Sequence, residues 1–317
     1  MTDTQNEVFK SPVNKIRLFE HGAPGSQNLK LTRKYYTEDM PDGRVKHIVP
    51  NITDPDIVPY IPDGIGNSTD RQRIPAVLII PGCAFRRLVY NFEGEDVAKW
   101  LNSMGIAAFV LECRLPSDEH DNAEDVPLID AMRAMRVIRG RAQEFGIDEA
   151  KIGVMGFSAG GFMAALLSTA YESDVYADYK YKDEYDKLSA RPDFAVCSYP
   201  VISIDDCIEA GKRYMSEEQV LERISDSKAK ILHKYNPDKL VRPDMPPVFI
   251  CETDDDRTTL SENSVGFYMA ARKAGVSAEL HIFRTGGHGY GCGDDFAQTG
   301  EWKVLFTKWI KSIGIIS

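Results

Sequence analysis

One serine has neighbours that suit it for nucleophilic chemistry. Ser158 lies in the run Gly-Phe-Ser-Ala-Gly-Gly at 156–161, between a short apolar stretch and a segment rich in alanine and leucine. A serine at a sharp turn between a strand and a helix is held in a strained backbone that exposes its Oγ, and flanking glycines leave room for that turn. The same residues would also suit an N-capping serine in an ordinary glycine-rich turn. The position between an expected strand and an expected helix favours the nucleophile.

A serine hydroxyl is a weak nucleophile until a base takes its proton. The candidate base is His288, in a glycine-rich loop at 285–291 that follows the last expected strand. A carboxylate must then orient the imidazole. Asp254, Asp255 and Asp256 follow an apolar stretch, and only one of the three can face the histidine. Serine, aspartate and histidine in this chain order are typical of an α/β-hydrolase.

An oxyanion that develops on a carbonyl substrate needs N–H donors on two sides. The helix expected after Ser158 begins at Ala159 and directs its first amides and its positive dipole end toward that site. The second donor is expected in the loop Pro-Gly-Cys-Ala-Phe at 81–85, where Cys83 or Ala84 would supply the N–H. Losing one such donor typically costs about 2.7–4 kcal/mol in the transition state.

The elements that must position these residues alternate between short apolar stretches and longer helical patterns. From about residue 76, strands are expected at 76–80, 106–111, 152–156, 193–199, 248–251 and 278–283, with helical segments between most of them. This alternation predicts an α/β fold with a mostly parallel central sheet and helices on both faces.

We predict a single domain over residues 1–317. Residues 1–75 contain short apolar stretches among proline, glycine and asparagine turns, and are expected to form an antiparallel edge or flap of the same sheet. Residues 76–317 form the expected core. Within the core, about 202–241 is charged and weakly periodic, which predicts an insertion of helices over one end of the sheet, like a cap.

The charge balance excludes several classes of partner. The 317 residues carry 38 basic and 48 acidic side chains, for a formal net charge of −10. Nucleic acids and anionic membranes attract lysine- and arginine-rich surfaces, so neither is expected as a partner. No uncharged apolar stretch approaches the ~20 residues of a membrane-spanning helix, and the amino-terminal residues lack the basic start and apolar run of a signal peptide. We therefore expect a cytoplasmic protein.

Cysteines and histidines give no sign of a metal site or a disulfide framework. The six cysteines are scattered without a C-x-x-C pair, and a zinc site needs clustered ligands. We expect no metal and no organic cofactor. His21, His47, His120 and His233 have polar neighbours in the sequence and are expected at the surface.

Together these features resemble the α/β-hydrolase superfamily, and within it the small esterases of the acetyl-esterase and hemicellulose-deacetylating type. The resemblance covers most of the chain, from about residue 16 to the C-terminal helical segment. The matching motifs are Pro-Gly-Cys-Ala-Phe (81–85), Glu-Gly (93–94), Gly-Phe-Ser-Ala-Gly-Gly (156–161), Arg-Pro-Asp (191–193), Tyr-Pro-Val (199–201), Pro-Pro-Val-Phe (246–249), Asp-Asp-Arg (255–257), Glu-Asn-Ser (262–264), Ala-Gly-Val-Ser-Ala-Glu-Leu-His (274–281) and Gly-Gly-His-Gly (286–289).

The resemblance selects one aspartate and shows two departures. In relatives with an Asp-Asp-Arg run the first aspartate usually orients the histidine, which implies Asp255, with Asp256 and Asp254 as alternatives. Similar esterases usually have consecutive glycines where this chain has Cys83 and Ala84, which would adopt the same backbone angles only at a cost of about 1–2 kcal/mol. A Val-Pro pair commonly follows the two aspartates, whereas Thr-Thr-Leu stands here.

The resemblance implies a serine carboxylester hydrolase that removes small acyl groups, above all acetyl. Its substrate would be a small-molecule ester such as an acetylated sugar or xylo-oligosaccharide, and Arg86, Arg87 and Glu93 are candidates for contacts to sugar hydroxyls. One alternative is a serine peptidase of the prolyl-oligopeptidase type, which shares the triad order but usually carries a large propeller domain. The other is a non-catalytic binding protein, which the altered oxyanion loop would suit.

Overall fold

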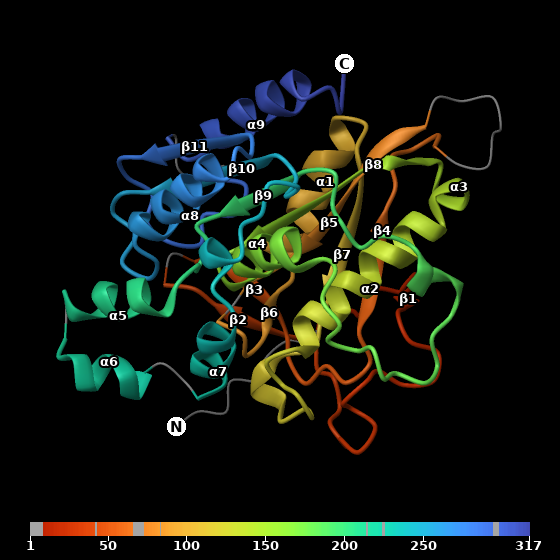
Figure 1. Cartoon of the computed structure of the whole chain (residues 1–317), viewed down its shortest axis with the longest axis horizontal. Helices are drawn as coiled ribbons and strands as arrows, with labels where there is room; N and C mark the ends of the chain where they lie inside the picture. The colour runs from red at the N-terminus through yellow and green to blue at the C-terminus, as the bar shows by residue number, and fades with distance from the viewer. Residues whose placement is uncertain are drawn as a thin grey trace.

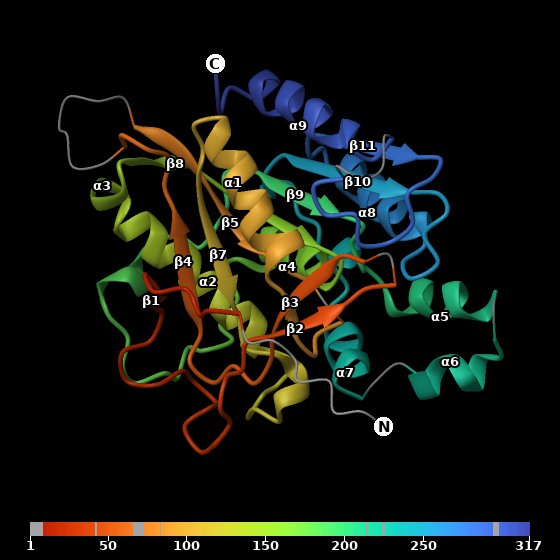
Figure 2. The ribbon, with the colours of Figure 1, turned by 180° about the vertical axis from the view of Figure 1, so that it is seen from behind.

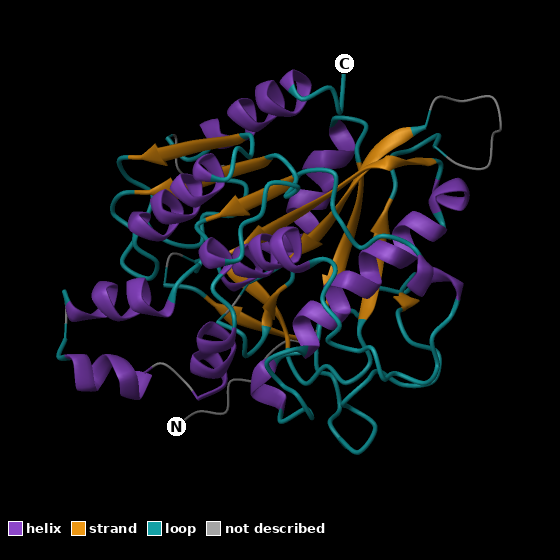
Figure 3. Ribbon diagram, viewed as in Figure 1, coloured by secondary structure: helices purple, strands orange, loops and turns teal. Residues whose placement is uncertain are grey.

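A sheet of eight strands forms the centre of the molecule (Figures 1 and 3). The computed structural model describes residues 9–41, 43–65, 73–82, 84–213, 215–223, 226–293 and 298–317. The strand order is β1-β4-β7-β5-β8-β9-β10-β11. These strands are β1 Ile16–Arg17, β4 Asp56–Tyr60, β5 Ile74–Ile80, β7 Ala107–Glu112, β8 Ile147–Phe157, β9 Ala195–Ser198, β10 Val248–Thr253 and β11 Ala278–Phe283. The β1–β4 and β4–β7 pairs are antiparallel, and the others are parallel.

Helices cover both faces of this sheet (Figures 1 and 2). α2, α4 and α8 lie on the face toward the viewer in Figure 1, and α1 and α9 lie on the opposite face, toward the viewer in Figure 2. Trp100 of α1 and Trp302 of α9 pack edge to face, with ring centroids 4.9 Å apart. The helices are α1 Asp96–Ser103, α2 Val126–Gly140, α3 Ala142–Phe145, α4 Ala159–Ala170, α5 Ile204–Lys212, α6 Glu217–Arg223, α7 Asp226–Lys234, α8 Ser261–Lys273 and α9 Glu301–Ser312, with shorter turns η1 Asn91–Glu95, η2 Pro116–Asp118, η3 Glu184–Lys187 and η4 Pro237–Lys239. The predicted fold class is confirmed.

Apolar residues at both faces explain the centre of the sheet. β7 is buried at every position, and β5 at every position after its first. Such continuous burial is expected for strands covered by helices on both sides. β11, at the sheet edge, is half-buried along most of its length.

The amino-terminal segment divides between two sheets. β1 and β4 add to the central sheet, whereas β2 (Tyr36–Asp39) and β3 (Val45–Val49) form a separate antiparallel sheet with β6 (Leu88–Val89). β6 directly follows the loop at 81–85, and its Val89 amide donates to Gly82 O at 3.1 Å. Through β6, the small sheet therefore anchors this loop. An edge strand of the central sheet would not make that contact.

The segment at 202–241 folds as α5, α6, α7 and η4, and Figure 1 shows α5 and α6 standing out from the rest of the chain. Ser203 begins α5, and its Oγ accepts hydrogen bonds from the amides of Asp205 and Asp206. Among the described residues, no helix has the length and apolar character needed to cross a bilayer. Cys113, Cys197 and Cys251 are buried free thiols.

His120 is buried, contrary to the prediction that it lies at the surface. It is 5% exposed, and its Nδ1 lies 2.9 Å from Ser26 Oγ. The loop that covers it is distant in the sequence: the Asp121 amide donates to Gly25 O at 2.9 Å. Neighbours along the chain therefore carry no sign of the burial. Burial, together with the nearby guanidinium of Arg114, lowers the pKa of His120 to about 4.

We predict that acid destabilises the fold through His120. An unfolded histidine binds its proton near pH 6.5, whereas the folded pKa is about 4, so the unfolded state binds more protons between these values. Stability should fall as the pH drops through this window, by about 3 kcal/mol at most from this group. In His120→Gln this dependence should be absent. Urea denaturation of both proteins from pH 7 to pH 4 measures the difference in unfolding free energy.

The comparison with the variant isolates this one group. The pKa of Asp118 is raised to about 6 by burial, which gives a slope of opposite sign in the same pH range. That contribution is common to both proteins and cancels in the difference. A difference that stays constant between pH 7 and pH 4 would contradict the assignment.

Candidate active site

Ser158 occupies the turn between β8 and α4. Its backbone has φ 53° and ψ −118°, a combination that an L-residue holds only when its surroundings enforce it. The Ser158 amide donates to Ser198 O on β9 at 3.0 Å. The strained strand-to-helix turn expected from the sequence is therefore present, at the carboxyl edge of the parallel strands.

Three glycines permit this turn because backbone segments approach one another closely there. A Cβ on Gly156 would lie 1.9 Å from Gly160 O, and a Cβ on Gly160 would lie 1.9 Å from Ile80 O. A Cβ on Gly82 would lie 2.9 Å from Ser158 Cβ. All three distances are shorter than atoms of a folded protein tolerate, so larger residues are excluded at these positions.

His288 connects Ser158 to a buried carboxylate. Its Nε2 lies 2.8 Å from Ser158 Oγ, and its Nδ1 lies 2.6 Å from Asp256 Oδ2. The Asp256 side chain is fully buried, and the His288 side chain is 21% exposed. Because the carboxylate accepts the Nδ1 proton, Nε2 is left to accept the proton of the serine hydroxyl. This arrangement can move a proton from Oγ to the imidazole.

Asp256 remains charged although it is buried. Burial disfavours its carboxylate, but hydrogen bonding to His288 and to backbone amides outweighs that cost and lowers the pKa of Asp256 below its ordinary value. The amides of Thr258 and Thr259 donate to Oδ1 at 2.7 and 2.9 Å, and Thr259 Oγ1 donates to Oδ2 at 3.0 Å. These threonines stand where similar esterases have Val-Pro. A proline could not donate an amide hydrogen bond there.

Asp255, which the resemblance selects, does not contact His288. Its Oδ1 accepts from the amides of Gly286 and Gly287 at 3.0 and 2.8 Å, so it fixes the loop that carries the histidine. Asp254 is exposed. The partner of His288 is therefore corrected to Asp256, because only the third aspartate after β10 turns its side chain inward.

Two residues of the loop at 81–85 have backbone angles that are energetically costly for any residue but glycine. Ala84 and Phe85 have φ values of 55° and 61°, in the left-handed region that favours glycine. Cys83, one of the two predicted oxyanion donors, lies outside the described residues. Ala159 opens α4, so its amide is among the first four that have no partner within the helix. Gly82 of the loop and Ala159 of the helix thus both lie next to Ser158.

Glu93, predicted to contact substrate, is instead buried beneath this loop. Its Oε2 accepts from the Gly82 amide at 2.8 Å, and its Oε1 accepts from Tyr199 Oη at 3.0 Å. Tyr199 Oη in turn accepts from the Gly291 amide at 3.1 Å, and its ring packs edge-on against His288. Burial raises the pKa of Glu93, an effect that His288 and the Gly82 amide partly offset. Glu93 therefore joins the loop at 81–85 to the loop of His288.

Sequence reasoning missed Tyr199 as part of this network. In the sequence, Tyr199 stood out only as the first member of the Tyr-Pro-Val motif at 199–201. In the structure its backbone is strained, with a positive φ of 37°. That strain is a structural signal, absent from the sequence. Of the two arginines predicted to contact sugar, Arg86 is exposed and Arg87 forms an ion pair with Glu38. In the described part of the chain, no three metal-ligating side chains gather as a metal site would require.

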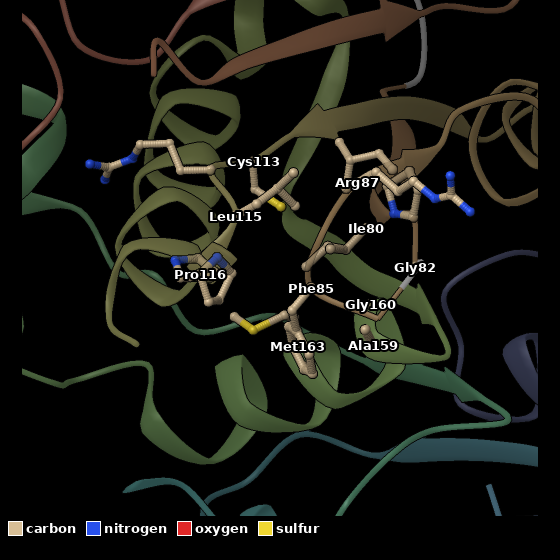
Figure 4. A pocket seen from close by; sticks show the side chains of 14 residues that line it. Ile80, Gly82, Phe85, Arg87, Cys113, Leu115, Pro116, Ala159, Gly160 and Met163 are labelled. Carbon is tan, nitrogen blue, oxygen red and sulfur yellow. The ribbon is translucent and has the colours of Figure 1, made fainter. Parts of the chain in front are cut away.

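A small apolar pocket lies behind the loop and the start of α4 (Figure 4). Figure 4 shows Gly82 and Ala159 on one side of it and Cys113, Leu115 and Pro116 on the other. The remaining lining residues are Ile80, Pro81, Phe85, Arg87, Leu88, Arg114, Pro127, Gly160 and Met163. The pocket thus shares Gly82 with the loop at 81–85 and Ala159 with the start of α4.

Similar proteins of known activity include an esterase and a xylanase. Acetylxylan esterase of Xylanibacter ruminicola is 30% identical over 240 residues, which cover 75% of this chain and 45% of that protein. Endo-1,4-beta-xylanase B of Butyrivibrio fibrisolvens is 30% identical over 227 residues, which cover 71% of this chain and 34% of that protein. The chain therefore spans less than half the length of these two relatives.

Solved structures and a family model extend the comparison. The acetyl ester-xyloside bifunctional hydrolase of Caldicellulosiruptor lactoaceticus is 34% identical, with a TM-score of 0.72 over 96% of this chain and 97% of that one. These similarities confirm the predicted resemblance to α/β-hydrolase esterases. The BD-FAE family model matches residues 65–270. The chain therefore belongs to the BD-FAE family and has the α/β-hydrolase fold.

Proposed function

We propose that this protein is a serine carboxylester hydrolase that removes small acyl groups through Ser158, His288 and Asp256. The observation that carries the proposal is the continuous hydrogen-bonded path from the Ser158 hydroxyl through both nitrogens of His288 to the buried Asp256 carboxylate. A serine in a strained turn, a base and an orienting carboxylate are the parts that acyl transfer needs. No metal or organic cofactor is part of the proposed reaction.

The reaction proceeds in two steps. Ser158 Oγ attacks the ester carbonyl while His288 Nε2 takes its proton, and Asp256 stabilises the imidazolium. The amide of Ala159 and one amide of the loop at 81–85 stabilise the negative oxygen of the tetrahedral intermediate. His288 then gives its proton to the alkoxy oxygen as the ester C–O bond breaks, so the alcohol departs and the acyl group stays bonded to Ser158 Oγ. Water, activated by the same imidazole, releases the acid and restores the serine.

The proposed substrate is an acetylated sugar or a short acetylated xylo-oligosaccharide. The proposal draws on relatives named for acetyl esters and xylan, of which the Caldicellulosiruptor enzyme matches nearly the whole chain. The net charge of −10 favours neutral esters over polymers that carry acidic groups.

Ser158→Ala should abolish hydrolysis of p-nitrophenyl acetate, because the variant has no nucleophile at this position. The wild type should also be labelled at Ser158 by a fluorophosphonate probe, which reacts only with an activated serine. The circular dichroism spectrum of the variant should match that of the wild type. Full turnover by the folded variant would end the proposal.

A wild type without labelling or turnover would favour a binding protein, in line with the strained backbone of Ala84 and Phe85.

The three neighbouring aspartates should differ sharply in their effect on kcat. Asp256→Asn should lower kcat by about 10⁴-fold, as loss of the orienting carboxylate does in serine hydrolases of this type. Asp255→Asn keeps a carbonyl oxygen for the amides of Gly286 and Gly287 and should stay within about threefold of the wild type. Asp254→Asn, at an exposed position, is the matched control. If Asp255→Asn had the larger effect, the assignment of Asp256 would be wrong.

Glu93 should act as a positioning residue, so its replacement should change kcat more than KM. Glu93→Gln offers one acceptor instead of two, which leaves the Gly82 amide or the Tyr199 hydroxyl without its partner. An unsatisfied buried donor costs about 1–3 kcal/mol, so kcat should fall by about tenfold or more. Glu95→Gln, in the same turn but partly exposed, is the control.

A double-mutant cycle separates positioning from general destabilisation. If Glu93 acts through Tyr199, adding Tyr199→Phe to Glu93→Gln should lower kcat much less than Tyr199→Phe does in the wild type. A change confined to KM, or fully additive effects of the two substitutions, would refute the positioning role.

A further inference from the structure

A second carboxyl group lies buried beside Asp256, and the proposed reaction does not use it. Glu252 is 0% exposed and belongs to β10, the strand before the turn that carries Asp256. That turn folds back onto the strand, since the Asp256 amide donates to Thr253 O at 3.4 Å. The carboxyl groups of Glu252 and Asp256 are hydrogen-bond partners. Two carboxyl groups can share a hydrogen bond only when one of them carries a proton.

The donors around this pair decide which carboxyl group is ionised. Asp256 accepts from His288 Nδ1, from two backbone amides and from a threonine hydroxyl. Glu252 has fewer donors: the Thr253 amide donates to Oε1 at 2.9 Å, and Ser264 Oγ on α8 donates to Oε2 at 3.3 Å. Hydrogen bonds to a carboxylate favour its charged form. The charge therefore lies on Asp256, and the proton lies on Glu252.

The surroundings of Glu252 offer nothing to offset a charge there. Within the described part of the chain, no lysine, arginine or histidine forms an ion pair or hydrogen bond with it. The titratable groups that face it come from its own turn, its own strand and the histidine loop, and are Asp256, Cys251 and Tyr290. From the neighbouring elements, α8 presents the neutral Ser264, and β11 pairs with Glu252 at Ile282. Burial and the charge of Asp256 raise the pKa of Glu252 well above its ordinary value.

We propose that Glu252 is a protonated acid that positions Asp256 through an O–H···O hydrogen bond to the Asp256 carboxylate. The inference rests on the proposed esterase function and extends the hydrogen-bonded path from Ser158 by one group. The added hydrogen bond holds the carboxylate toward His288 Nδ1 and makes it less basic, so the imidazolium keeps its proton until the alcohol takes it. A neutral Glu252 also adds no second negative charge beside the base.

Glu252→Gln and Glu252→Met separate the hydrogen bond from the bulk of the side chain. The glutamine amide donates to Asp256 and accepts from Thr253, and the Ser264 hydroxyl can turn to accept the second N–H, so kcat should stay within about threefold of the wild type. Methionine fills a similar volume without a donor. In that variant kcat should fall about tenfold or more while KM stays nearly unchanged, because Asp256 loses a buried partner. Glu262→Gln, at an exposed position of α8, is the matched control.

The pH dependence of kcat/KM reports whether Glu252 is charged. Activity falls in acid as His288 becomes protonated in the free enzyme. Replacing a neutral acid with glutamine leaves the charge unchanged, so the midpoint of this fall in Glu252→Gln should equal that of the wild type. An ionised carboxylate would instead hold the imidazolium more strongly, and its removal would move the fall to lower pH. Such a shift would contradict the proposal.

Infrared spectra test the proton on Glu252 without any turnover. At pH 8 the wild type should show a C=O stretching band of a protonated carboxylic acid that is missing in Glu252→Gln and retained in Glu262→Gln. Burial also raises the pKa of Glu93, but that group is common to all three proteins and cancels in the difference. A difference spectrum without this band, or an unchanged kcat in Glu252→Met, would overturn the inference.

The outcomes separate this inference from the function on which it rests. A wild type that cleaves no ester and resists fluorophosphonate would refute the esterase, and the positioning role with it. The infrared band would still decide whether Glu252 is protonated. With an active wild type, the same band and the kcat of Glu252→Met test the inference alone. Glu252→Leu, which also lacks a donor, takes the place of Glu252→Met if that variant does not fold.

Discussion

The close approach of three backbone segments around Ser158 is the constraint on which the rest of the site depends. The end of β5, the end of β8 and the start of α4 meet so tightly that Gly160 lies against Ile80 O and Gly156 against Gly160 O. This contact forces the serine into its strained φ and ψ, and a strain of about 1–3 kcal/mol persists only where surrounding structure enforces it. The rigidity comes from a buried parallel sheet. A hydroxyl held this way does not need to be ordered when substrate binds.

Strands that are buried along their whole length could be predicted from the sequence. The apolar stretches at 76–80 and 248–251 became β5 and β10, because strands covered by helices on both faces must be apolar throughout. The serine turn and the glycine-rich histidine loop could also be predicted, because glycine occurs where the backbone needs unusual angles or close contacts. The choice among three consecutive aspartates was different. It depends on how the chain turns after β10 and on amides of Thr258 and Thr259, and no property of the aspartates themselves distinguishes them.

Charged and polar residues buried by distant segments could not be recognised from their neighbours. Glu93 and His120 both stand in polar surroundings along the chain, yet each is covered by elements far away in the sequence. In both cases the environment disfavours the charged form, raising the pKa of the acid and lowering that of the base. Glu93 has two hydrogen-bond donors that offset part of this cost, whereas His120 has one hydroxyl partner. A buried carboxylate with two donors from separate loops is typical of a group that fixes backbone positions.

The loop at 81–85 keeps its shape without the glycines usual in similar esterases, and the energetics explain how. Left-handed angles at Ala84 and Phe85 cost about 1–2 kcal/mol each. Burial of the Phe85 side chain returns about 1.5–3 kcal/mol, and its edge-to-face contact with Phe162 adds about 0.5–1.5 kcal/mol. A glycine at 85 would relieve the strain but forfeit both contributions. The pairing of β6 and the Glu93 bond to Gly82 anchor the loop further. The departure from the glycine pattern is therefore compatible with a rigid donor loop.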